Sequence, residues 1–122
     1  MRLSPLSPEL QTVIAQSPLV VHPERYAVAQ VSHCADPAPH FLVTHEADEI
    51  TVITTETAIA TLDDVRQVER WFRLLEFRVS VPFESPGFLA TIAQTIAAQG
   101  KNILLASTFS KDWALLREED LE

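Results

Sequence analysis

The clearest pattern in the chain is an alternation of apolar and polar residues from Arg73 to Val81. Every second side chain of a β-strand points to the same face of its sheet, so this alternation predicts a half-buried strand. The apolar positions are Leu75, Phe77, Val79 and Val81, and the polar positions between them are Glu76, Arg78 and Ser80. We therefore expect a sheet with one apolar face in this part of the chain.

A helix is predicted to follow this strand, beginning at Ser85 and Pro86 and ending at Gly100. A serine side chain accepts a hydrogen bond from a backbone N–H at a helix start, and a proline in the first helical position loses no bond that it needs. Glycine is common just beyond the last turn. Apolar residues recur on one stripe of this helix and can pack on the apolar sheet face: Phe88, Leu89, Ile92, Ala93, Ile96 and Ala97.

Two short apolar runs complete the C-terminal pattern, Asn102–Phe109 and Trp113–Arg117. The polar residues Ser110, Lys111 and Asp112 separate them at hairpin length. The order from Arg73 onward is therefore β-α-β-β, which is half of a ferredoxin-like fold.

The N-terminal half shows weaker patterns. We expect a short helix in Met1–Gln16, short strands at Leu19–Val21 and Tyr26–Val31, a hairpin made by Phe41–His45 and Glu49–Thr54, and one helical turn in Val65–Trp71. An open apolar edge of a sheet invites pairing, so we expect Leu19–Val21, from the same chain or from a partner chain, to pair with an edge of the C-terminal sheet.

Composition and charge exclude several classes of function. The 122 residues carry a formal net charge of -8, and the 9 basic residues are scattered rather than clustered, so we expect no nucleic-acid partner. Gly87 and Gly100 are the only glycines, too few for a Gly-rich phosphate loop. A single cysteine and the lack of a long apolar run favour a cytoplasmic protein with no membrane partner.

Four residues raise the question of a metal site or a catalytic nucleophile: His33, Cys34, His40 and His45. Imidazole and thiolate are the ligands that zinc prefers, but the spacing fits no paired zinc motif. No serine has the context of a nucleophile elbow, and nothing near Cys34 indicates a triad. We interpret these residues as loop histidines and a small thiol, and we expect no enzyme activity, no metal and no cofactor.

The residues from Val68 to the end resemble the C-terminal half of small stand-alone ACT-domain proteins related to the CASTOR-type arginine sensors. Residues Tyr26–Thr55 resemble the N-terminal half of that family more weakly. The resemblance implies an α+β, ferredoxin-like chain of tandem βαββ units with antiparallel sheets and helices on one face. Its divisions would be 1–25 as helix and added strand, 26–64 as the first ACT-like unit and 65–122 as the second. A homodimer is expected.

The corner between the predicted strand and helix is the candidate binding site. The first backbone N–H groups of a helix and its dipole favour a carboxylate, and Gly87 would let a ligand approach the backbone closely. These residues also fit a purely structural role, in which they only begin the helix. The resemblance implies that an amino acid binds there against a neighbouring ACT unit, and that an acid near the last hairpin holds its amino group.

Carried over to this sequence, the implied site residues are Glu84, Ser85, Pro86, Gly87 and Phe88 at the corner, with Thr108, Phe109, Ser110 and Asp112 at the hairpin. The hairpin segment STFSKDW resembles the family's STYDTDY, but Ser110 stands where the first acid is usual and Lys111 lies beside it. We expect a non-catalytic sensor or regulatory protein that binds an amino acid. The alternatives are an oligomerisation module with a vestigial site and, less favoured, an enzyme that uses Cys34 with a nearby histidine.

Overall fold

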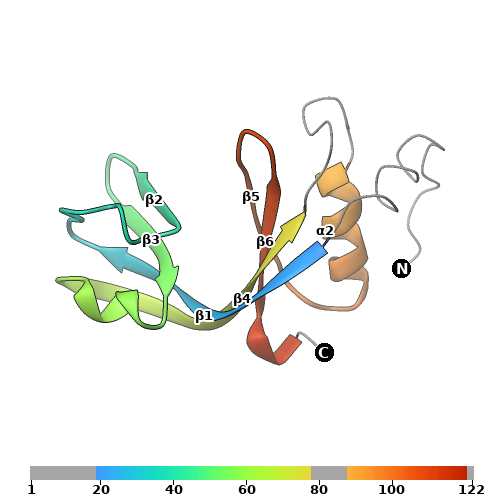
Figure 1. Ribbon diagram of the computed structural model, residues 1–122, viewed down its shortest axis with the longest axis horizontal. Coiled ribbons are helices and arrows are strands. Elements are labelled where there is room, and N and C mark those ends of the chain that lie inside the picture. Colours follow the sequence, from blue (N-terminus) through green and yellow to red (C-terminus); the bar gives the residue numbers. More distant parts are fainter. Residues whose placement is uncertain (1–18, 78–87, 121–122) are drawn as a thin grey trace. The chain divides into compact units, whose positions relative to one another are not determined.

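The computed structural model describes residues 19–77 and 88–120, and Figure 1 labels their strands and the helix α2. The elements are β1 (Leu19–Val31), β2 (Leu42–His45), β3 (Ile50–Thr55), the 3₁₀ helix η1 (Ala58–Thr61), β4 (Val65–Phe77), α2 (Phe88–Ala98), β5 (Leu104–Ser107), β6 (Asp112–Arg117) and the 3₁₀ helix η3 (Glu118–Asp120). The chain forms two compact units. One is Pro23–Arg73, and the other, here called the C-terminal unit, joins the chain up to His22 with the chain from Leu74 onward.

The C-terminal unit has the predicted β-α-β-β order, with β4 followed by α2, β5 and β6. Its strands lie in the order β1-β4-β6-β5, and β5 and β6 pair antiparallel from Leu104 opposite Leu115 to Ser107 opposite Asp112. The predicted strand is confirmed as far as Phe77, while Val79 and Val81 lie outside the described residues.

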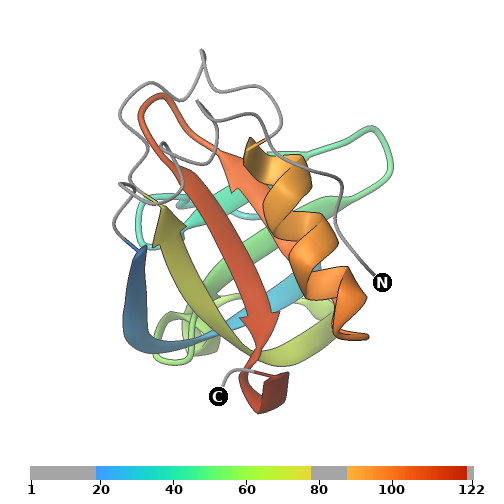
Figure 2. The same ribbon diagram turned by 90° about the vertical axis from the view of Figure 1, so that its right-hand side faces the viewer.

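The core of the C-terminal unit forms where α2 covers one face of its strands (Figure 2). Ile92 and Ile96 of α2, with Ile103, pack on the buried side chains Leu75, Phe77, Ala114 and Leu116. The predicted apolar stripe is confirmed at these two isoleucines, whereas Ala97, which was also assigned to it, is exposed.

The first strand of the chain pairs as the sequence predicts. β1 neighbours β4, and its first residues belong to the same compact unit as the C-terminal strands. The expected pairing of Leu19–Val21 with an edge of the C-terminal sheet is therefore confirmed, with the strand coming from the same chain. The predicted helix in Met1–Gln16 lies outside the described residues.

The Pro23–Arg73 unit is built from strands. β2 and β3 form the predicted hairpin, closed by the Glu46 N–H bonded to the Glu49 carbonyl at 2.8 Å, and β3 pairs antiparallel with β1 from Tyr26 opposite Thr55 to Val31 opposite Ile50. Its core is Ala29, Val31 and Val52 with partly buried neighbours that include Cys34 and Val43.

Two expectations for this unit are not met. All of Pro23–Arg73 is described, and it holds the 3₁₀ helix η1 but no α-helix, so a tandem arrangement of two βαββ units is not confirmed. The predicted helical turn in Val65–Trp71 is wrong, because these residues belong to β4. β4 extends into this stretch because it pairs with β1. Only Val68 and Trp71 are partly buried there, so the sequence has too few apolar positions to predict a strand.

None of the helices in the described ranges has the length and apolarity that a transmembrane span requires.

Candidate functional site

Only part of the predicted strand-to-helix corner can be placed. Glu84, Ser85, Pro86 and Gly87 lie outside the described residues, and α2 begins at Phe88, the fifth residue of the predicted corner. The C-terminal unit thus contains the start of α2 and the β5–β6 hairpin, the two parts of the predicted site that the structure describes.

The hairpin half of the site is held by its own hydrogen bonds. The Thr108 N–H donates to the Lys111 carbonyl at 2.9 Å, and the Thr108 hydroxyl lies 3.2 Å from the same oxygen. The indole N–H of Trp113 donates to Thr108 Oγ1 at 3.2 Å. Phe109 and Ser110 form the exposed tip, with Phe109 85% exposed. The turn is therefore fixed in shape while its tip faces solvent.

Asp112 lies at the base of this turn and is only 5% exposed. It is opposite Ser107 in the β5–β6 ladder, and the Ser107 hydroxyl donates to Asp112 Oδ1 at 2.8 Å. Buried carboxylates require hydrogen-bond donors, and one of the two oxygens of Asp112 has such a donor here. This carboxylate is the only acid of the predicted hairpin motif in the chain, since Ser110 occupies the other position.

Glu76 is a buried charged residue that sequence reasoning assigned to the polar side of its strand. It is 3% exposed, and its Oε1 lies 2.9 Å from His22 Nε2 of β1. The His22 ring in turn lies 5.7 Å from the Trp113 ring, centroid to centroid. The four residues from Leu74 to Phe77 are all buried, so both faces of β4 are covered there. An alternation of apolar and polar residues predicts one buried strand face, so the sequence pattern could not reveal that the other face of β4 is covered as well.

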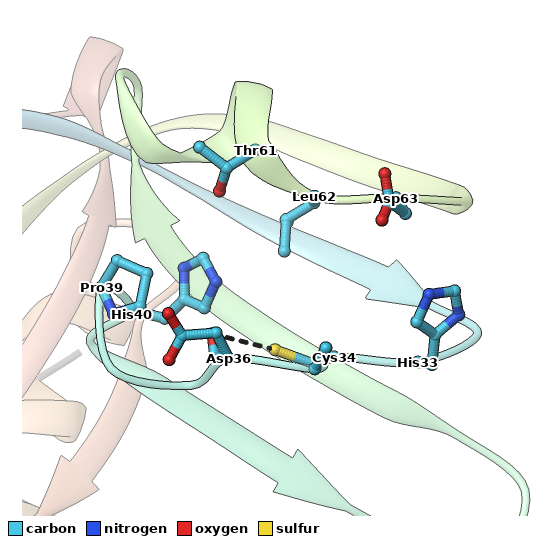
Figure 3. Close-up of a pocket in the computed structure, with 9 residues that line it drawn as sticks. His33, Cys34, Asp36, Pro39, His40, Thr61, Leu62 and Asp63 are labelled. Atoms are coloured by element: carbon cyan, nitrogen blue, oxygen red, sulfur yellow. Dashed lines mark hydrogen bonds between the residues drawn. The ribbon is translucent and has the colours of Figure 1, made fainter.

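A separate cavity of about 260 Å³ lies in the Pro23–Arg73 unit, between the loop that follows β1 and the end of η1 (Figure 3). Three of the four metal-ligand candidates of the sequence line it, namely His33, Cys34 and His40, whereas His45 lies on β2. No group of three or more metal-ligating side chains with suitable geometry occurs in the part of the chain that the structure describes. What the cavity does bring together is a set of polar side chains around a partly apolar space.

The ring of Trp71 in β4 has two arginines beside it. The Arg25 guanidinium lies 4.6 Å from the Trp71 ring centroid and that of Arg70 lies 5.3 Å from it. Arg25 also donates to Glu56 at 3.2 Å. These contacts favour a structural role for Trp71, because its ring already has cationic neighbours.

Burial also perturbs one tyrosine in this unit. Desolvation, with a smaller contribution from the negative charge of Glu24, raises the pKa of Tyr26 above its usual value of 10.0. Its phenol therefore stays protonated throughout the physiological range and packs edge-on against Phe41, with ring centroids 6.3 Å apart.

Comparison with solved structures shows the fold. The chain is similar to VC0802 from Vibrio cholerae, a protein of unknown function described as a possible transport protein, with 15% identity, a TM-score of 0.75, and coverage of 91% of this chain and 86% of that one. It is also similar to Atu0741 from Agobacterium tumefaciens, with 21% identity, a TM-score of 0.71, and coverage of 85% and 80% of the two chains. Comparison with curated proteins gave no match.

Comparison with protein families addresses the C-terminal part of the chain. Residues 67–122, which contain the β4–α2–β5–β6 succession and the hairpin with Asp112, match the ACT domain model. Over this range, the match supports the resemblance to ACT-domain proteins that was inferred from the sequence.

Proposed function

We propose that this protein is a non-catalytic regulatory protein whose ACT domain binds a small molecule, and that the ligand is an amino acid. The observation that carries the proposal is the ACT domain match over residues 67–122, because ACT domains in general are regulatory ligand-binding modules. The β-α-β-β order of this range supports it, since it brings the start of α2 and the β5–β6 hairpin into one unit.

We assign a role to each end of the ligand from the residues of the predicted site. The carboxylate of the amino acid is proposed to bind at the predicted corner, Glu84–Gly87 with Phe88 of α2, because the first backbone N–H groups of a helix favour an anion. The ammonium group is proposed to bind Asp112, whose Oδ1 already accepts from Ser107. Because Asp112 is buried, a charge-assisted bond to its other oxygen would be little screened by water. A neighbouring ACT unit from a second copy of the chain would close the site, so the proposed functional state is a homodimer. We propose that this homodimer is cytoplasmic.

The test is a thermal-shift screen of the full chain against the proteinogenic amino acids, followed by calorimetric titration of any ligand that raises the melting temperature. We expect one selective amino acid, and we expect Asp112→Asn to weaken its binding about tenfold or more, the loss typical of a charged hydrogen bond. Asp120→Asn, the same change in the terminal 3₁₀ helix η3, is the matched control and should leave affinity unchanged. Equal affinity in the Asp112 variant, with its fold intact, would refute the site.

The alternative is an oligomerisation module without a ligand. One observation favours it: β5 ends the order of the described strands and carries the exposed apolar side chains Leu104 and Leu105, and Phe109 in the turn after β5 is exposed as well. An apolar strand at the edge of a sheet invites pairing with another chain. A flat screen at millimolar ligand, together with a dimer in light scattering that Leu105→Lys dissociates, would replace the sensor with this alternative.

A further inference from the structure

The cavity in the Pro23–Arg73 unit lies outside residues 67–122, so the ACT domain match assigns it no role. One wall is the loop after β1, which carries Cys34, Asp36 and His40, and the opposite wall is the end of η1 with Thr61 and Leu62 (Figure 3). All of its lining residues belong to one compact unit. The site is therefore complete within a single copy of the chain.

The charges of the lining residues determine whether the cavity favours a positively or a negatively charged ligand. Asp36 and Asp63 are carboxylates, and no lysine or arginine is among the lining residues. By contrast, the depression beside the β2–β3 turn contains Arg66 together with its acidic residues. Both carboxylates are exposed, so water screens their charge, but its sign still makes the cavity favour a cation over a carboxylate or a phosphate.

Its polar groups are held in place before any ligand arrives. Asp36 Oδ1 accepts the Ala38 N–H at 3.1 Å, and the Cys34 thiol lies 3.7 Å from the Asp36 carbonyl oxygen. His40 Nδ1 lies 2.8 Å from Oγ1 of Thr54, a fully buried residue. In the tautomer that carries its proton on Nδ1 and donates it to Thr54, His40 Nε2 is an acceptor for an N–H group. A carboxylate and an imidazole acceptor therefore line the same cavity in fixed orientations.

Size and apolar surface define the rest of the ligand. Pockets for drug-sized molecules measure about 300–1,000 Å³, so a cavity of about 260 Å³ suits a smaller molecule. Ala35, Pro39 and Leu62 supply apolar lining for a short carbon chain. A bare metal ion would not use that surface, and the described side chains offer no suitable metal geometry.

We propose that this cavity binds a small organic ammonium ion, with its charged nitrogen at Asp36 and His40 and its carbon chain against Pro39 and Leu62. Asp63 adds a second negative charge to the lining and attracts the cation without being its principal partner. This site is distinct from the proposed amino-acid site of the ACT domain, and each can fail without the other.

The experiment is an NMR titration of the ¹⁵N-labelled full chain with butylammonium, with butyrate and 1-butanol as probes of equal chain length but different charge. We expect saturable shift changes in residues 33–40 and 61–63 with butylammonium, and none that saturate with the other two. Asp36→Asn keeps an acceptor for the Ala38 N–H while removing the charge, and it should weaken butylammonium binding about threefold, the loss typical of an exposed ion pair. Asp48→Asn, an exposed aspartate on the β2–β3 turn, should bind as the parent does.

Three outcomes would overturn the proposal: no shifts at these residues, equal responses to butyrate, or unchanged affinity in Asp36→Asn with a native spectrum. If that variant fails to fold, Asp63→Asn replaces it, and it must then bind butylammonium more weakly than Asp48→Asn does. Shifts confined to residues 107–113 would support the ACT domain site and refute this one.

Discussion

Asp64 shows how one residue can combine a backbone and an electrostatic role. It precedes β4 with φ of 49°, in the left-handed region that most residues avoid and that aspartate and asparagine tolerate. A hydrogen bond from the Ser32 side chain, followed by the positive charge of Arg66, lowers the pKa of its carboxyl below the usual 3.8. The Arg66 guanidinium lies 3.3 Å from Asp64 Oδ2.

We predict that Asp64→Asn loses stability at neutral pH and that the loss disappears in acid. A carboxyl with a lowered pKa in the folded state contributes stability above its unfolded pKa, and that contribution is lost as the pH falls through the folded value, here below 3.8. Asparagine keeps the left-handed backbone, so the comparison isolates the charge. Urea unfolding at neutral pH and at a series of pH values below 3.8 follows how the difference between parent and variant falls. A gap between parent and variant that stays constant with pH would contradict the assignment, and Asp63→Asn is the neighbouring control.

Residues of the candidate sites differ in how far the sequence reveals them. Asp112 could be singled out because its motif is local, but the sequence placed it in the polar turn, whereas it is the first residue of β6, opposite Ser107 and bonded to it. The burial of Glu76 could not be predicted, because its neighbour His22 lies 54 positions away along the chain. His33, Cys34 and His40 drew attention as a cluster, but their cavity depends on where η1 brings Thr61 and Leu62.

At the scale of elements, the end of α2 is a Schellman motif built on Gly100. The Gly100 N–H donates to the Ala97 carbonyl at 2.9 Å, and the Lys101 N–H donates to the Ile96 carbonyl at 3.3 Å. Gly100 has φ of 75°, a left-handed conformation that glycine adopts without strain. The glycine stop read from the sequence is therefore confirmed together with its hydrogen bonds.

We predict that Gly100→Ala destabilises the protein by about 1 kcal/mol, the cost of a left-handed alanine less the entropy it removes from the unfolded chain. A methyl group at this position would meet nothing within 4 Å, so the loss comes from the backbone and not from a clash. Chemical denaturation gives the free energy of unfolding of both proteins. Gln99→Ala, an exposed change one residue earlier, should stay within about 0.5 kcal/mol. An unchanged free energy of unfolding in Gly100→Ala would mean that the end of α2 rearranges without loss of stability.

Strands β1 and β4 mark the limit of prediction from pattern at this scale. Alternation identified the second half of β4, where apolar side chains are buried, and missed the first half, where most residues are exposed. Leu19–Val21 and Tyr26–Val31 were expected as two strands, but they form one strand through Pro23. Proline lacks an N–H for a ladder, and β3 pairs with β1 only from Tyr26 onward, so Pro23 falls where β3 requires no donor.

At the scale of the whole molecule, the chain's first described strand completes the sheet of its last domain. In the C-terminal unit β1 neighbours β4 on the side away from β6, next to the β-α-β-β succession that matches the ACT domain. The sequence indicated that another strand was needed, because the C-terminal pattern left an edge open. The choice of this strand depends on contacts between distant parts of the chain, and one of them in the C-terminal unit is the hydrogen bond between His22 of β1 and Glu76 of β4.

We predict that His22→Ala destabilises the C-terminal unit by about 1–3 kcal/mol, because it removes a hydrogen-bond partner of a buried carboxylate. The His22 ring contact with Trp113 is lost as well, so tryptophan fluorescence should change along with the free energy of unfolding. His45→Ala, at an exposed histidine on β2, is the control and should shift stability by less than about 0.5 kcal/mol. Hydrogen exchange then locates the effect. Faster exchange in β4 and β6 but not in the β2–β3 hairpin is expected, whereas a uniform increase would show that the strand from the start of the chain does not specifically support the C-terminal sheet.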